Sequence, residues 1–172
     1  AHGAANALHT IIETGELLKD NNQIEFVLIG DGPNKIELQQ LAAQKSLKNI
    51  KFLPSVPKKE IPNYLNAADA LVITLRAVAL FSYGVSPNKL FDYMAAAKPV
   101  ICAVGGDMAK LVKEADAGIA VEPEDAAGLA DALTGLMKDS AKCAMYGANG
   151  RKFIEKNFSR ERMADVLIHH IA

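Results

Sequence analysis

The chain has few cysteines and no excess of charge of either sign, and each absence argues against a class of protein. Only Cys102 and Cys143 occur among 172 residues, so a disulfide framework is not expected and a reducing compartment such as the cytoplasm is favoured. Nineteen basic residues stand against 20 acidic ones, without a dense basic run. This balance argues against a nucleic-acid partner.

Long apolar runs and the common hydrolase motifs are missing too. No stretch approaches the ~20 apolar residues of a membrane-spanning helix, and the N-terminal residues show no signal pattern. The four histidines have no carboxylate or cysteine at metal-ligand spacing, so no metal site is expected. A nucleophile elbow, a Walker loop and a zinc-protease motif are absent, which leaves hydrolase chemistry without a visible nucleophile.

Apolar β-rich runs alternate with helical patterns, and half of the residues are hydrophobic. The expected strands are 24–29, 50–53, 70–75, 99–104 and 118–121, and the expected helices are 3–18, 34–47, 58–68, 86–97, 106–115, 125–138, 140–156 and 159–171. This alternation predicts an α/β domain with a Rossmann-like parallel sheet, helices on both faces and C-terminal helices at the end. The first helix needs a strand to pack on, so we expect a strand upstream of Ala1.

The segment Ser86–Ile101 carries the strongest chemical signal. Ser86 is a favoured N-cap and Pro87 suits the first helical turn, so the free backbone N–H groups there can bind an anion. Lys89 lies in this turn, where a cation opposes the helix dipole unless an anion is bound. Asp92 follows on the same flank. The spacing predicts a site for a nucleoside diphosphate and its ribose; the alternative is a half-buried helix in which Lys89 and Asp92 merely pair.

Three loops follow expected strands at their carboxyl ends, where parallel sheets bind ligands. Gly30-Asp31-Gly32-Pro33 allows close approach of the backbone to a ligand, although the same residues also form ordinary tight turns. Pro54–Pro57 is a stiff loop that can present backbone groups to a flat base. Arg76–Val85 lacks periodicity and is a candidate mobile loop beside the Ser86 helix.

Five segments occur in the order seen in the C-terminal domain of family 4 glycosyltransferases, which nearly the whole chain resembles. They are Gly30–Pro33, Asn49–Val56, Ala67–Val72, Ser86–Ile101 and Gly118–Asp125. Members of this family have the two-domain GT-B fold, in which the C-terminal half binds the sugar-nucleotide donor and the N-terminal half mostly binds the acceptor. The resemblance implies that residues 1–172 are a single donor-nucleotide-binding domain, with the acceptor domain upstream.

The resemblance also assigns roles to individual residues. Asp92 takes the place of the second glutamate of the family's Glu-x7-Glu element, which grips the ribose hydroxyls, and the first glutamate falls at Gly84 and is lost. Lys89 and Asp92 are the expected catalytic residues, and Ala97 stands where the family usually has glycine. The residues expected to bind the donor are Gly30, Asp31, Gly32, Ser55, Val56, Pro57, Tyr83, Gly84, Val85, Ser86, Pro87, Asn88, Lys89 and Asp92.

The implied reaction is transfer of a glycosyl group from a UDP- or GDP-linked sugar to a hydroxyl, with retention of anomeric configuration. Neither a metal nor a separate cofactor is expected, because the resemblance implies an enzyme that works without a bound metal and the chain has no Asp-x-Asp motif. Charge that develops on the diphosphate is expected to be stabilised by Lys89 and helix-end amides. The resembling subgroup builds bacterial capsule, O-antigen or exopolysaccharide. This implies a cytoplasmic enzyme that works on a glycan or lipid-linked sugar, with peripheral association of the full-length enzyme at the inner face of the membrane.

Two alternatives to a transferase stay open at this point. One is a nucleotide-binding module without catalysis, which the loss of the glutamate at Gly84 favours slightly. The other is a sugar-nucleotide epimerase of GT-B shape, although its additional acid/base residues cannot be placed in this chain. Under the transferase reading, residues 1–172 alone are expected to bind nucleotide weakly and to be inactive.

Overall fold

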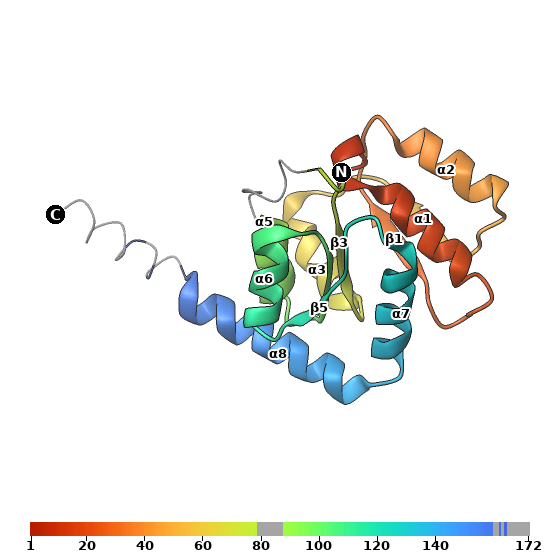
Figure 1. The fold of residues 1–172 in the computed structure, drawn as a ribbon. Helices are drawn as coiled ribbons and strands as arrows, with labels where there is room; N and C mark the ends of the chain where they lie inside the picture. Colours follow the sequence, from red (N-terminus) through yellow and green to blue (C-terminus); the bar gives the residue numbers. More distant parts are fainter. Residues whose placement is uncertain (79–87, 160–161, 163, 165–172) are drawn as a thin grey trace.

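The computed structural model describes residues 1–78, 88–159, 162 and 164. Parallel strands carry helices on both faces (Figure 1), which confirms the predicted α/β class. The strands are β1 (Phe26–Ile29), β2 (Ile50–Leu53), β3 (Leu71–Thr74), β4 (Val100–Ala103) and β5 (Gly118–Ala120). The helices are α1 (Leu8–Leu17), α2 (Lys35–Gln44), α3 (Ile61–Ala67), α5 (Asn88–Ala95), α6 (Gly106–Glu114), α7 (Ala126–Met137) and α8 (Ser140–Asn157), with short 3-10 helices η1 (Ala4–Asn6) and η2 (Lys58–Glu60).

The strands form two parallel sheets among the described residues, where the sequence predicts one. One sheet pairs β1 with β2, beginning with Phe26 opposite Ile50. The other has the order β3-β4-β5, with Leu71 opposite Val100 and Val100 opposite Gly118. Each strand lies within its expected range, and four of the five are one or two residues shorter than expected, so the main difference is in which strands are neighbours.

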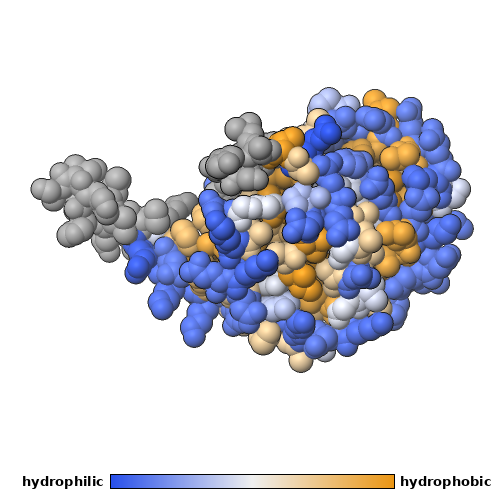
Figure 2. All heavy atoms as spheres, in the orientation of Figure 1, coloured by the Kyte–Doolittle hydropathy of each residue, from blue (hydrophilic) through white to orange (hydrophobic). Residues whose placement is uncertain are grey.

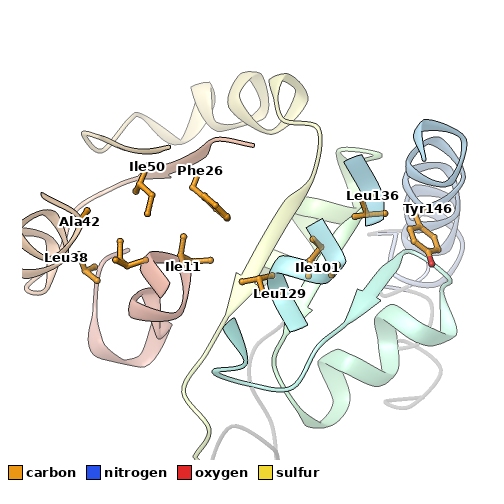
Figure 3. Packing of buried hydrophobic residues seen from close by; sticks show 11 residues of the cluster. Ile11, Phe26, Leu38, Ala42, Ile50, Ile101, Leu129, Leu136 and Tyr146 are labelled. Carbon is orange, nitrogen blue, oxygen red and sulfur yellow. The ribbon is translucent and has the colours of Figure 1, made fainter. Parts of the chain in front are cut away.

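Helices cover both faces of these sheets, and the apolar strands are buried beneath them. All four residues of β4 are buried, as expected for a strand covered on both faces. α3 lies on one face, and α1 and α7 pack against each other on the opposite face (Figures 1 and 3). Figure 3 shows the labelled core residues in two groups, one around α1, α2, β1 and β2 and the other around β4, α7 and α8.

The first helix begins later than the sequence predicts. Ala7 has a left-handed backbone, with φ of 44°, and separates η1 from α1. The carbonyl groups before it have tertiary partners: Ala5 accepts from the N–H of Arg76, and Asn6 accepts from the hydroxyl of Thr74. These bonds replace part of the helical ladder expected from residue 3 onward.

Three other expected helices differ from the sequence prediction or lie partly outside the described residues. The helix expected at 58–68 is divided into η2 and α3, with Pro62 in the first turn of α3. Most of the helix expected at 159–171, and the first two residues of that expected at 86–97, lie outside the described residues.

The face of the molecule that Figure 2 shows is mostly hydrophilic, with apolar atoms between the polar groups. No helix in the described ranges is both long and apolar enough to cross a bilayer.

Candidate functional site

The N-terminal segment bridges the carboxyl ends of β1 and β3. On the β1 side, the N–H of His2 donates to the carbonyl of Asp31 at 2.9 Å, and the N–H of Asn34 donates to the carbonyl of His2 at 3.0 Å. On the β3 side, the N–H of Arg76 donates to Ala5 at 3.1 Å. The loops that follow two different strands therefore meet across residues 2–6.

The two glycines of the Gly30-Asp31-Gly32-Pro33 loop allow its backbone to lie close to the N-terminal segment. Their φ angles are 130° and 154°, and a Cβ on Gly32 would lie 2.7 Å from the backbone carbon and oxygen of His2. Glycine is therefore needed for close approach of the N-terminal segment. The side chain of Lys35 fixes the same region, because its Nζ donates to the carbonyls of Gly30 at 2.8 Å and Leu53 at 3.1 Å.

Lys89 and Asp92 line one groove together with His2 and Asn6. The ammonium of Lys89 donates to Oδ1 of Asn6 at 2.9 Å, and Lys89 forms no ion pair with Asp92 in the described part of the chain. The alternative in which these two side chains merely neutralise each other is thus not what the structure shows. Partial burial of the ammonium lowers the pKa of Lys89, although the residue as a whole is exposed.

Asp92 lies one helical turn beyond the start of α5, and its side chain is exposed. Burial, and then the nearby Asp92 carboxylate, raise the pKa of the neighbouring Tyr93 phenol. The apolar face of α5 holds the helix in place, because Leu90 and Met94 are completely buried. α5 thus presents a cation and a carboxylate from a firmly packed helix.

A second polar cluster, at Glu124, was not found by sequence reasoning. Its carboxylate accepts a hydrogen bond from the N–H of Ala77 at 2.7 Å and contacts His9 at 3.0 Å and Arg76 at 4.0 Å. The Ala77 N–H is the main reason why the pKa of Glu124 is lowered, and His9 and Arg76 lower it further. Glu124 also has a left-handed backbone, with φ of 62°. The cluster fixes the first residues of the Arg76–Val85 loop to α1.

His2 is a second residue to which the sequence gave no role. Its side chain is 1% exposed, and neither ring nitrogen has a hydrogen-bond partner among the described residues. Burial lowers its pKa, which favours the neutral ring. Asn6 and Lys35 were missed for the same reason as Glu124: their partners are distant in sequence, so no local motif marks them.

The remaining residues predicted to bind the donor are exposed or half-buried beside η2 and α5, or lie outside the described ranges. Ser55 and Pro57 are exposed beside η2, and Val56 is half-buried there. Asn88 is exposed at the first residue of α5. Five predicted residues lie outside the described ranges: Tyr83, Gly84, Val85, Ser86 and Pro87.

This fold and this placement of polar residues at strand ends correspond to a known class of protein. The sequence model of the family described as "Glycosyl transferases group 1" matches residues 4–153. The match covers most of the chain, and the chain belongs to this family, as the sequence resemblance predicts. The GT-B fold expected from that resemblance is confirmed as well.

Curated relatives include bacterial glycosyltransferases named for colanic acid, O-antigen chain and lipopolysaccharide core. The chain is 28% identical over 173 residues to the putative colanic acid biosynthesis glycosyl transferase WcaI of Escherichia coli, covering 98% of this chain and 40% of the relative. It is 31% identical over 145 residues to a GDP-mannose-dependent phosphatidylinositol monomannoside mannosyltransferase of Corynebacterium glutamicum, covering 83% and 37% of the two chains. The chain therefore spans about 40% of the length of these relatives.

Solved structures show the same fold. HepE of Anabaena in complex with UDP-glucose superposes with a TM-score of 0.80 at 22% identity, over 97% of this chain and 46% of that one. The C-terminal domain of the group 1 glycosyl transferase LpcC of Francisella tularensis superposes with a TM-score of 0.74 at 25% identity, over 91% and 81%.

Proposed function

We propose that the full-length protein transfers a glycosyl group from a nucleoside diphosphate sugar to a hydroxyl of a glycan or lipid-linked sugar, with retention, and that residues 1–172 bind the donor. The observation that carries this proposal is the placement of Lys89. It is a partly desolvated cation in the first turn of α5, held by Asn6 and, among the residues that the structure describes, not by a carboxylate. Family membership and a UDP-glucose complex of a protein with the same fold support it.

The diphosphate is the natural partner for this cation. An ammonium has three N–H donors, and Asn6 takes one of them, which leaves two for phosphate oxygens. The free N–H groups at the start of α5 and its helix dipole also favour an anion there. When the bond to the anomeric carbon breaks, negative charge develops on the diphosphate, and these donors stabilise it without reorganisation.

Asp92 is suited to bind the ribose. It follows Lys89 on the same flank of α5 and lines the same groove, and its carboxylate oxygens have no ion-pair partner within the described residues. A carboxylate accepts hydrogen bonds from two vicinal hydroxyls. Phosphate contacts at Lys89 and hydroxyl contacts at Asp92 thus match successive parts of one nucleoside diphosphate.

The relatives suggest where such a transferase acts. Several are named for colanic acid, O-antigen or lipopolysaccharide core synthesis in bacteria, so we place this protein in bacterial surface-polysaccharide synthesis on the cytoplasmic side. The family match favours a transferase over the epimerase alternative.

The test is calorimetric titration of the full-length protein with UDP, GDP and the corresponding sugar nucleotides. We expect Lys89→Ala and Asp92→Ala each to weaken nucleotide binding at least about tenfold, or about 1.4 kcal/mol. Matched controls are Lys152→Ala on α8 and Asp131→Ala on α7, which are exposed and should bind like the wild type. Unchanged affinity and unchanged transfer in both site variants would overturn the proposal.

A further inference from the structure

Lys35, like Lys89, lies in the first turn of a helix that follows a strand. It is the first residue of α2, where a cation opposes the helix dipole. No carboxylate offsets this, because Lys35 forms no ion pair within the described ranges. The side-chain amide of Asn34, the N-cap, donates to Glu37 at 3.1 Å, and in the described structure it caps no N–H of the helix. Stability of α2 therefore does not explain a lysine at this position.

The ammonium of Lys35 instead joins the carboxyl ends of β1 and β2. Its Nζ donates to the carbonyl of Gly30, directly after β1, at 2.8 Å. It also donates to the carbonyl of Leu53, the last residue of β2, at 3.1 Å. The side chain is half-buried, which strengthens both bonds relative to bonds made in open water. One charged group thus holds two neighbouring strands together.

The backbone ladder between β1 and β2 is weaker at this end than at the other. The N–H of Phe26 donates to Asn49 at 2.8 Å, whereas the N–H of Gly30 donates to Leu53 at 3.3 Å. Neither strand pairs with any further strand among the described residues. Hydrogen bonds from a charged donor are stronger than those between neutral groups, so Lys35 makes the main connection where the strands end.

Both carbonyls that Lys35 binds stand at the start of loops predicted to bind the donor. Gly30–Pro33 follows β1, and Pro54–Pro57 follows β2. The second loop is stiff, because Pro54 and Pro57 have fixed φ angles and the loop leads directly into η2. A shift of Leu53 would therefore move the whole loop. The distance between the two loops is set at the ammonium of Lys35.

The Lys89 end of the site is held by other contacts. Lys89 bonds to the side chain of Asn6, and the backbone carbonyl of Asn6 accepts from Thr74 at 2.6 Å, at the end of β3. β3 pairs with β4, whereas the carbonyls that Lys35 binds belong to the β1–β2 pair. Loss of the Lys35 ammonium should therefore displace the loops after β1 and β2 and leave the cation on α5 in place.

We propose that Lys35 is a positioning residue for the nucleoside part of the donor. It fixes the spacing between the loops Gly30–Pro33 and Pro54–Pro57, and thereby sets which nucleobase fits between their backbone groups. Backbone donors and acceptors distinguish bases only when they lie at hydrogen-bond distance, so a small shift of one loop reduces selectivity. This inference rests on the proposed function, because it assigns both loops to the donor. Lys35 itself does not contact the ligand.

The test is calorimetric titration of the full-length protein with UDP, GDP and inorganic pyrophosphate, which has no nucleoside. Lys35→Met removes the ammonium and keeps an unbranched stem. We expect it to bind the preferred nucleotide at least about tenfold more weakly than the wild type, and to distinguish UDP from GDP less well. Its affinity for pyrophosphate should stay within about twofold. Lys48→Met, at an exposed position between α2 and β2, is the matched control and should bind all three ligands like the wild type.

Lys89→Ala separates this inference from the proposed function, because it should weaken nucleotide and pyrophosphate alike. Wild-type protein that binds no nucleotide would overturn both proposals. If Lys89→Ala behaves as expected while Lys35→Met binds nucleotide like the wild type, the positioning role alone is overturned. Equal losses for nucleotide and pyrophosphate in Lys35→Met would also overturn it, because the effect would then not be confined to the nucleoside.

Lys35→Arg provides a second variant in case Lys35→Met does not fold. A guanidinium keeps the charge and has enough N–H groups to donate to both carbonyls, so nucleotide affinity should stay within about threefold of the wild type. A loss in Lys35→Arg as large as that expected for Lys35→Met would indicate that the ammonium contacts the donor directly, and it would overturn the positioning role.

Discussion

The ammonium of Lys89 donates a 2.9 Å hydrogen bond to the side-chain oxygen of Asn6. The bond joins α5 to the segment before α1, two elements that are far apart in sequence. Asn6 also accepts a bond of 2.6 Å at its backbone carbonyl from the hydroxyl of Thr74, so its position is fixed from both ends. A neutral amide at this position orients the cation without neutralising it, which keeps the full positive charge for an anionic ligand.

The first prediction follows from this neutrality. Asn6→Asp places a carboxylate beside Lys89, which pairs with the cation and repels phosphate. We expect affinity for UDP or GDP to fall about tenfold in the full-length protein, or about 1.4 kcal/mol, and to fall less in Asn6→Ala. Calorimetry measures both. Asn22→Asp, at an exposed position, is the charge-matched control, and equal losses in Asn6→Asp and Asn6→Ala would contradict the role given to the neutral amide.

The second prediction concerns pH. Burial lowers the pKa of Lys89 below its ordinary value of 10.5, so the unbound protein becomes more stable as pH rises through the lowered pKa. A diphosphate favours the charged lysine, so nucleotide affinity should fall over the same range. The nucleotide affinity of Lys89→Arg should change little over this pH range, because a guanidinium stays charged. Titrations between about pH 7 and 10 test this, and an identical fall in both proteins would show that another group titrates.

The third prediction concerns Glu124, whose carboxylate holds the N–H of Ala77 and contacts His9. Glu124→Ala should lower the free energy of unfolding by about 1 kcal/mol at neutral pH. Because these contacts lower the pKa of Glu124 from 4.5, their contribution is present above that value and is lost as pH falls through the lowered pKa. Urea unfolding should therefore show a smaller difference in the free energy of unfolding between wild type and Glu124→Ala in acid than at pH 7. Glu122→Ala, at an exposed neighbouring position, should leave the free energy of unfolding unchanged at both pH values.

The fourth prediction concerns the end of α5. Ala97 has φ of 55°, a left-handed conformation that costs an alanine about 1 kcal/mol and a glycine very little. Ala97→Gly should raise the free energy of unfolding by up to about 1 kcal/mol, after the greater flexibility of glycine in the unfolded chain is subtracted. Ala148→Gly, at an exposed position inside α8, should instead lower it by a similar amount. Thermal unfolding of both variants tests this prediction. A change of the same sign in the free energy of unfolding of the two variants would contradict the strain at Ala97.

Local patterns predicted the helices and strands well, because the burial of an element is reflected in the order of apolar and polar residues within it. The run Val100–Ala103 is apolar throughout and is a strand buried on both faces. The left-handed backbone at Ala97 fits a position where the family usually has glycine. The family was also recognisable, because its motifs occur in a fixed order along the chain.

What could not be predicted depends on contacts between distant residues. The break at Ala7 arises because Ala5 and Asn6 bond to the end of β3, and no helix propensity reveals that. The contact between His9 and Glu124 is hidden for the same reason. The division of the strands into two sheets is likewise a question of neighbours, which periodicity within a strand does not answer.

The strand order has a consequence for how the chain folds. Each described sheet pairs strands that follow one another in sequence, with one described helix between them, so most of its contacts are of low contact order. Long-range closure depends on the packing of α1 against α7 and on the bonds of residues 2–6. We therefore expect each sheet to assemble early from its own βαβ units and the two to dock late. Substitutions at the α1–α7 contact should then mainly speed unfolding and leave the folding rate nearly unchanged.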